Sequence, residues 1–195
     1  SLVVVWAEGT DIRAKSYDPI ADAWSSADGD AALNYDAGNF AADPVFARLG
    51  DELYLFWRED DSLGNGQLRA RVYDGTAWAF VDGGAETSDL NGNPSGEGVR
   101  VQPAPLTFEG TLYVGFGEKD SQDIDRLRVA AFNGDSSTPQ WSFVDGGQSA
   151  GLNADADYGV ERAVAIAHEG TVVITWMQFV GAAPEAAGVR VIQGR

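Results

Sequence analysis

Three loops carry side-chain oxygens at the spacing that calcium ligands use. The loops read Asn34-Tyr35-Asp36, Asn91-Gly92-Asn93 and Asn153-Ala154-Asp155-Ala156-Asp157-Tyr158-Gly159. Oxygens at alternate positions are what a calcium loop supplies, and Asn153, Asp155 and Asp157 come closest to that pattern. The glycine of this loop is one position late and no glutamate follows at the twelfth position, while Asn and Asp are also ordinary loop residues. Calcium is therefore a candidate cofactor, and a plain polar loop is the alternative.

The same loops could instead hold a carbohydrate. Asn and Asp side chains can bond to sugar hydroxyls, and aromatic rings such as Tyr35, Phe40 and Tyr158 can stack on sugar faces. The candidate ligand-binding residues are Asn34, Tyr35, Asp36, Asn91, Asn93, Asn153 and Tyr158.

A second chemically capable pattern recurs four times, as an aromatic residue followed two positions later by a carboxylate or amide and then by an arginine on the next β-prone run. Its members are Trp6, Glu8 and Arg13; Trp57, Glu59 and Arg69; Phe116, Glu118 and Arg128; and Trp176, Gln178 and Arg190. Side chains alternate along a strand, so the arginine should lie opposite the carboxylate or the aromatic ring. We expect a structural clamp through an ion pair or cation-π contact in each repeat, because catalysis seldom needs four copies. The alternative is a ring of arginines that binds an acidic ligand.

Catalytic residues do not stand out in the sequence. His168 is the single histidine, and its place before Glu169-Gly170 indicates an exposed turn. Thirty acidic residues always provide some pair of carboxylates, so glycoside hydrolysis has no specific signal. We expect no enzyme on this basis.

The elements that must position these residues are short strands in a repeat. Four β-prone runs, a to d, occupy residues 44–47, 53–57, 68–73 and 78–81, and a similar set begins at Pro105. Gly, Asn and Asp at the joints indicate tight antiparallel hairpins. A Leu-Asn pair follows run d in each unit, at Leu33, Leu90 and Leu152, so the repeat is about 60 residues long.

The b runs distinguish between a propeller and a sandwich. Residues 2–6 and 171–176 are apolar on both faces, which requires neighbouring sheets on both sides. Blades packed around an axis meet that requirement better than a two-sheet sandwich does. We predict an all-β protein, a β-propeller of about four four-stranded antiparallel blades in one domain, with repeats 1–34 (partial), 35–91, 92–153 and 154–195 (partial).

The two end blades are expected to be incomplete. The chain opens on run b and stops after run c, so the first blade should lack strand a and the last should lack strand d. We therefore expect a piece of a larger ring, or a chain whose gaps a neighbouring copy fills as a homo-oligomer, because raw strand edges invite pairing.

This order of motifs resembles the sialidase-like and Kelch-like propeller repeats of secreted and surface bacterial proteins. Asp74-Gly75-Thr76-Ala77-Trp78 falls at the turn where sialidase-like blades carry an Asp-box, but its aspartate and glycine are adjacent and the serine is absent. The resemblance implies the propeller fold and a secreted or surface location, and it does not carry sialidase activity across.

Composition limits the partners. A formal charge of -17 argues against nucleic acid, whose binding needs cationic side chains. No apolar run approaches the ~20 residues that span a membrane. Cysteine is absent, which excludes disulfides and thiolate metal sites. Excess carboxylate with only two lysines suggests adaptation to salty water, and simple colloidal solubility is the alternative.

These observations predict a non-catalytic recognition module of a secreted or surface protein, with carbohydrate as its ligand. Two alternatives stay open. One is a structural module that assembles through its incomplete end blades, and the other, less favoured, is a sialidase-like glycoside hydrolase.

Overall fold

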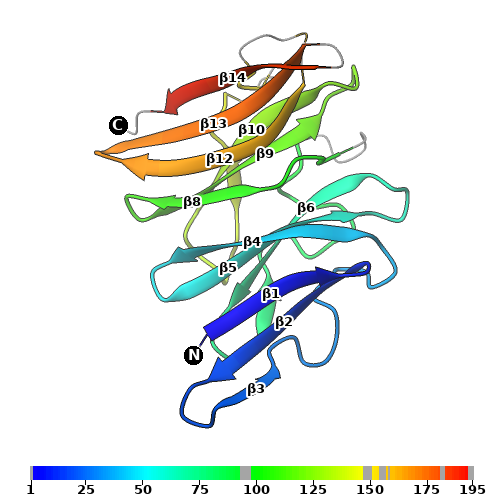
Figure 1. The fold of residues 1–195 in the computed structure, drawn as a ribbon, viewed down its shortest axis with the longest axis vertical. Helices are drawn as coiled ribbons and strands as arrows, with labels where there is room; N and C mark the ends of the chain where they lie inside the picture. Colours follow the sequence, from blue (N-terminus) through cyan, green and yellow to red (C-terminus); the bar gives the residue numbers. More distant parts are fainter. Residues whose placement is uncertain are drawn as a thin grey trace.

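The computed structural model describes residues 2–92, 98–146, 151–153, 157, 159–180 and 183–192, the last of these ranges by its backbone. All regular structure in this part of the chain is β-strand, and the fourteen strands form four separate sheets (Figure 1). No helix in these ranges is long and apolar enough to cross a membrane.

The sheets follow one another in chain order, and each is an antiparallel meander. The first contains β1 (Leu2–Glu8), β2 (Asp11–Asp18) and β3 (Ala23–Ser26), and the second contains β4 (Ala41–Leu49), β5 (Glu52–Asp60), β6 (Gly66–Tyr73) and β7 (Trp78–Phe80). The third contains β8 (Ala104–Phe108), β9 (Thr111–Lys119), β10 (Asp125–Phe132) and β11 (Trp141–Phe143), and the fourth contains β12 (Val160–His168), β13 (Thr171–Val180) and β14 (Ala183–Ile192).

The hairpin turns explain why the chain reverses where it does. Glu109 and Gly110 both have positive φ, at 48° and 77°, and so do Glu169 and Gly170, at 47° and 75°. Two successive positive φ values define the two-residue turn whose twist matches that of paired strands, and glycine adopts the second at little cost. These Glu-Gly turns therefore set the register of β8 with β9 and of β12 with β13.

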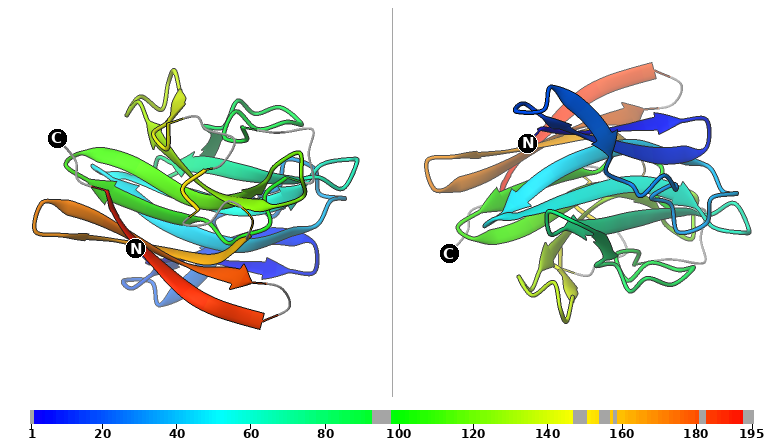
Figure 2. Two further views of the ribbon diagram at one scale, coloured as in Figure 1. Left: turned by 90° about the horizontal axis from the view of Figure 1, so that it is seen from above. Right: turned by 90° about the horizontal axis from the view of Figure 1, so that it is seen from below.

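Three apolar layers lie between successive sheets, which stack in chain order (Figures 1 and 2). The layer between the first and second sheets centres on Leu55 and Trp57, and the next centres on Phe56 and Phe116. The layer between the third and fourth sheets includes Trp176. Side chains on both faces of β5 are therefore buried. Residues 2–6, whose apolar run predicted burial on both faces, instead leave Leu2 and Val4 exposed.

Tryptophans near the outer edge of the sheets connect neighbouring repeats by hydrogen bonds. The indole Nε1 of Trp78 donates to the carbonyl oxygen of Ala27 (2.8 Å), and that of Trp141 donates to Val81 (2.7 Å). In both cases a tryptophan at the start of the last strand contacts the end of the preceding repeat.

The β-propeller prediction is confirmed, including the incomplete end blades. Among the described residues, the first sheet has no strand that corresponds to β4, and the last has none that corresponds to β7. Strands β4, β8 and β12 form the inner edges of their sheets and contact one another in sequence, as innermost strands of blades do.

Candidate functional site

A hollow of about 250 Å³ lies where the inner strands β4, β8 and β12 begin. Its wall is formed by Asp43, Arg100, Val101, Gln102, Asp125, Glu161 and Arg162. These residues come from the second, third and fourth blades, at the end of the sheets where β4, β8 and β12 begin. The hollow thus lies beside the propeller axis, and we call it the axial hollow.

Irregularities in two inner strands turn polar residues toward this hollow. The pairing of β4 with β5 shifts between Ala42 and Val45, and the pairing of β12 with β13 shifts between Glu161 and Val164. Inside these bulges Asp43 has φ 58° and Arg162 has φ 51°. β-Bulges re-aim side chains, and positive φ is costly for residues other than glycine.

The register shows that the bulged positions are equivalent in the repeat. Val45 pairs with Phe56, Ala104 with Gly115, and Val164 with Thr175. In each pair the second residue comes immediately before the repeated aromatic of its blade, which is Trp57, Phe116 or Trp176. Asp43, Gln102 and Arg162 each lie two residues before that paired position, and all three line the axial hollow. One position of the repeat therefore carries a different polar side chain in each of the second, third and fourth blades.

Asp125 has the most perturbed carboxyl group of the hollow. Burial is the largest influence and raises its pKa to about 6, while Lys119 and Arg100 oppose the rise and Glu161 adds to it. Its Oδ1 atom is buried and has no hydrogen-bond partner among the described residues. A partly buried carboxyl group that is protonated near neutral pH can donate a proton.

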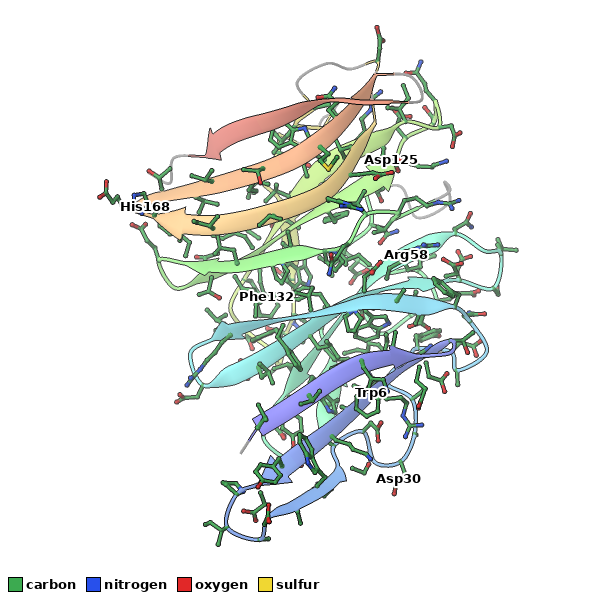
Figure 3. The ribbon with its side chains drawn as sticks, in the orientation of Figure 1. Trp6, Asp30, Arg58, Asp125, Phe132 and His168 are labelled. Atoms are coloured by element: carbon green, nitrogen blue, oxygen red, sulfur yellow. The ribbon has the colours of Figure 1, made fainter. Side chains whose placement is uncertain are left out.

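The single histidine is remote from this chemistry. His168 ends β12 at a hairpin turn, and Figure 3 shows it at the opposite end of the sheets from Asp125. Its side chain is largely exposed. The predicted exposed turn is therefore what the structure shows.

The predicted ligand asparagines instead bond to the backbone of their own blades. Oδ1 of Asn34, Asn91 and Asn153 accepts from the amides of Ile12 (2.7 Å), Leu68 (2.9 Å) and Leu127 (2.8 Å) respectively. The Nδ2 atoms donate to the carbonyl oxygens of Thr10, Gly66 and Asp125.

These asparagines tie each Leu-Asn loop to the third strand of its own blade. A ligand role for them stays a prediction, and it would have to coexist with these bonds. Asn93, Asp155 and Tyr158, which complete the predicted sugar and calcium sets, lie outside the described residues, and Asp157 is exposed. Within the described residues no group of three or more His, Cys, Asp or Glu side chains could hold a metal ion.

The repeated arginines lie opposite the aromatic residue in three blades. Trp6 pairs with Arg13, Trp57 with Arg69, and Phe116 with Arg128. In the fourth blade Trp176 faces Gly188, and Arg190 faces Ile174 in the backbone register. The sequence allowed either the carboxylate or the aromatic as the opposite residue, and the structure has the aromatic.

The main ionic partner of these arginines is an aspartate that the clamp prediction did not include. Arg13 contacts Asp28 at 2.7 Å, Arg69 contacts Asp82 at 3.6 Å, and Arg128 contacts Asp145 at 2.5 Å. Each aspartate opens an Asp-Gly sequence after the last strand of its blade, which was a recognisable signal. Of the predicted carboxylate partners, Glu118 lies 3.4 Å from Arg128.

Glu59 serves the neighbouring loop instead of an arginine. It is fully buried, and its carboxylate accepts from the indole of Trp57 (2.9 Å) and from the backbone amides of Tyr35 (2.9 Å) and Asp36 (2.8 Å). Gln178, at the equivalent position of the fourth blade, is also buried. Glu59 thus holds the Leu-Asn loop of the first repeat against the sheet of the second.

The comparisons with known proteins identify similar solved structures but no family. No protein-family model and no curated protein matches the chain. A thermostable family-43 glycoside hydrolase aligns over 97% of this chain and 67% of its own, with 12% identity and a TM-score of 0.52. An α-L-arabinofuranosidase from Lactobacillus brevis aligns over 93% of this chain and 62% of its own, with 14% identity and a TM-score of 0.48.

At this identity the likeness establishes the fold and nothing finer. The chain spans 62 to 67% of the length of these two structures. The resemblance to sialidase-like and Kelch-like repeats is therefore confirmed only at the level of the propeller. The prediction of a non-catalytic recognition or assembly module is contradicted by the neighbour with a TM-score above 0.5, which is a glycoside hydrolase.

Proposed function

We propose that the chain is the propeller of a glycoside hydrolase, and that the axial hollow binds and cleaves a glycosidic bond. The observation that carries the proposal is Asp125, a half-buried carboxyl group with a pKa of about 6 in a hollow that two other blades supply with carboxylates. Glycosidases use one carboxylic acid that is protonated at working pH and one ionised carboxylate. The glycoside hydrolases that share the fold add support.

In this proposal Asp125 protonates the oxygen of the leaving sugar. Burial keeps its proton at pH values where an exposed aspartic acid would have lost it, and the nearby Glu161 raises the pKa further. Asp43 is the second, ionised carboxylate of this proposal. It lies in the β-bulge of β4, so it reaches the hollow from a different blade than Asp125 does.

Polar side chains that flank these carboxylates would hold the sugar. Gln102 can both donate to and accept from hydroxyl groups, and Arg162 offers a planar fork of donors. The substrate class is a glycan, and a secreted or surface location, also proposed here, would give access to it.

The test is hydrolysis of a panel of aryl pentosides and hexosides and of plant and bacterial polysaccharides, with released sugar measured by mass spectrometry. We expect Asp125→Asn and Asp43→Asn to lower the rate by about 10²-fold or more, because proton transfer contributes 10²- to 10⁴-fold. The control is Glu109→Gln, an exposed carboxylate on the turn at the other end of the sheets. It should hydrolyse at the parental rate.

Two outcomes would contradict the proposal. One is a complete panel without hydrolysis by the parental chain. The other is hydrolysis that Asp125→Asn and Asp43→Asn leave at the level of Glu109→Gln.

A further inference from the structure

The outer face of the first sheet carries a complete copy of the repeat clamp. We use the name first clamp for Trp6, Glu8, Arg13 and Asp28, which occupy the positions of Trp57, Glu59, Arg69 and Asp82 in the second blade. A hollow of about 220 Å³ lies over the first clamp, and Lys15, Ser26 and Asp30 also line it. Figure 3 shows Trp6 and Asp30 at this end of the stack.

The second blade shows what covers a clamp. The ring of Tyr35, from the Leu-Asn loop of the preceding repeat, lies 4.6 Å from the guanidinium carbon of Arg69. The carboxylate of Glu59 accepts from the amides of Tyr35 and Asp36 and from the indole of Trp57. The covered arginine and glutamate are fully buried.

The third blade repeats this arrangement with a smaller loop residue. Gly92 follows the Leu-Asn pair of the second repeat, and a Cβ added to it would lie 2.9 Å from Nη1 of Arg128 and 3.1 Å from Oε2 of Glu118. The loop backbone therefore rests directly on the clamp. Two independent junctions thus place the residue after Leu-Asn on the arginine and carboxylate of the next repeat.

The first clamp has its internal bonds but no cover. Asp28 accepts from Nε of Arg13 (2.7 Å) and from the amide of Ala14 (3.0 Å). Its equivalents Asp82 and Asp145 accept the corresponding amide bonds, and Asp145 also accepts from Nε of Arg128. Among the described residues, however, the Nη atoms of Arg13, the indole nitrogen of Trp6 and the carboxylate of Glu8 have no hydrogen-bond partner.

Trp24 provides a second and separate sign. It pairs with an aromatic residue of the neighbouring strand, Tyr17, as Trp78 pairs with Tyr73 and Trp141 with Phe132. The indoles of Trp78 and Trp141 donate to the preceding repeat. The Trp24 side chain is instead 51% exposed and has no such bond among the described residues. Leu2, on the same sheet, is 54% exposed.

We propose that the outer face of the first sheet is a docking surface for a further propeller repeat of the same type. The Leu-Asn loop of that repeat would place an aromatic ring on Arg13 and two successive backbone amides on the carboxylate of Glu8. The end of its last strand would accept the hydrogen bond from Trp24. The surface therefore recognises a specific turn and not a general apolar partner.

A peptide of residues 26–42 of this chain is a suitable probe, because it contains both contacts that cover the second blade, the carbonyl of Ala27 and the ring of Tyr35. It would be titrated to millimolar concentration onto the isotope-labelled chain, and also fused ahead of Ser1 through a flexible linker that gives a millimolar effective concentration. The readout is the indole N–H resonances of Trp6 and Trp24, assigned with Trp6→Phe and Trp24→Phe.

We expect both resonances to shift and their hydrogen exchange to slow. Glu8→Ala in the chain, or Tyr35→Ala in the peptide, should weaken binding about tenfold, since each removes a charge-assisted or cation-π contact. Glu109→Ala, at an exposed turn of the third blade, is the matched control and should bind as the parent does.

Three results would overturn the proposal. The first is unchanged resonances with both the free and the fused peptide. The second is equal binding by the peptide that carries Tyr35→Ala. The third is broadening of Trp6 and Trp24 with rising protein concentration and no peptide, which would assign the face to a second copy of the chain.

Discussion

Two glycines two residues apart in β9 should respond to alanine in opposite directions. Gly115 faces an apolar cavity of about 130 Å³ between the third and fourth sheets, which Ala104 and Ile174 help to line. A Cβ at Gly115 would lie 3.8 to 3.9 Å from Ala104 and Ile174, which is ordinary van der Waals contact. A Cβ at Gly117 would lie 2.7 Å from Cβ of Val101 and nearer still to one of its methyl groups.

These distances give the sign and the size of both effects. Gly115→Ala lowers the entropy of the unfolded chain and buries a methyl group, so we expect about 1 to 2 kcal/mol of added stability. Gly117→Ala overpacks the junction, so we expect a loss of about 1 to 3 kcal/mol. The two variants should therefore differ by at least about 2 kcal/mol, with the parent between them.

The assay is urea unfolding followed by tryptophan fluorescence, with midpoints compared at an unchanged slope. Val101 lies between Arg100 and Gln102 in the wall of the axial hollow, so Gly117→Ala should also impair hydrolysis, whereas Gly115→Ala should not. A lower midpoint for Gly115→Ala, or a shift of both variants in the same direction, would refute the packing argument.

Four further outcomes are expected. Burial would raise the pKa of Asp28, but hydrogen bonds from Arg13 and from the backbone outweigh burial and lower the pKa to about 2. The ionised carboxylate therefore stabilises the fold above pH 4, and this contribution is lost as the pH falls from 4 to 2. Asp28→Asn should remove about 1 kcal/mol of the difference between the unfolding free energies at pH 7 and pH 3, measured by urea unfolding. The pKa of Asp125 is raised to about 6, so its carboxyl group destabilises the fold as pH rises from 4 to 6, and Asp125→Asn should add about 1 to 2 kcal/mol at pH 7 by the same assay. Asn91→Ala leaves the buried amide of Leu68 without its side-chain acceptor, while the carbonyl of Gly66 keeps its bond from the amide of Val99, so calorimetry should show a loss of about 1 to 3 kcal/mol. If the excess of carboxylates is an adaptation to salt, the melting temperature should rise between low and molar salt, and a flat profile would leave only solubility as its explanation.

The sequence was a good guide to the fold because the repeat signals are local. An aromatic residue and a short turn act within a few residues of one another and recur in every blade, and a Leu-Asn pair recurs in three of them. The incomplete end blades could also be predicted, because counting β-prone runs needs no knowledge of tertiary contacts.

The role of the asparagines was harder to foresee. Asn34 and Asn91 have the residue type of a ligand, but each is used to fasten a loop to a strand more than twenty residues away in sequence. The partners of Arg13 and Arg69 were missed for a similar reason, since Asp28 and Asp82 approach only when the last strand folds back. A short sequence motif does not show which distant backbone group or charged side chain a residue will bind after folding.

The axial hollow was missed because it occupies the position at which the repeats differ. Residues that build each blade are similar from copy to copy, whereas this one position of the repeat holds Asp43, Gln102 and Arg162 in the second, third and fourth blades. A search for repeated residues finds the scaffold and misses a site that is assembled once, beside the axis, from different side chains of the second, third and fourth blades. In a repeat protein whose blades surround a single site, the inward position that is most variable between copies is therefore the first place to look for function, and the clamps are the last.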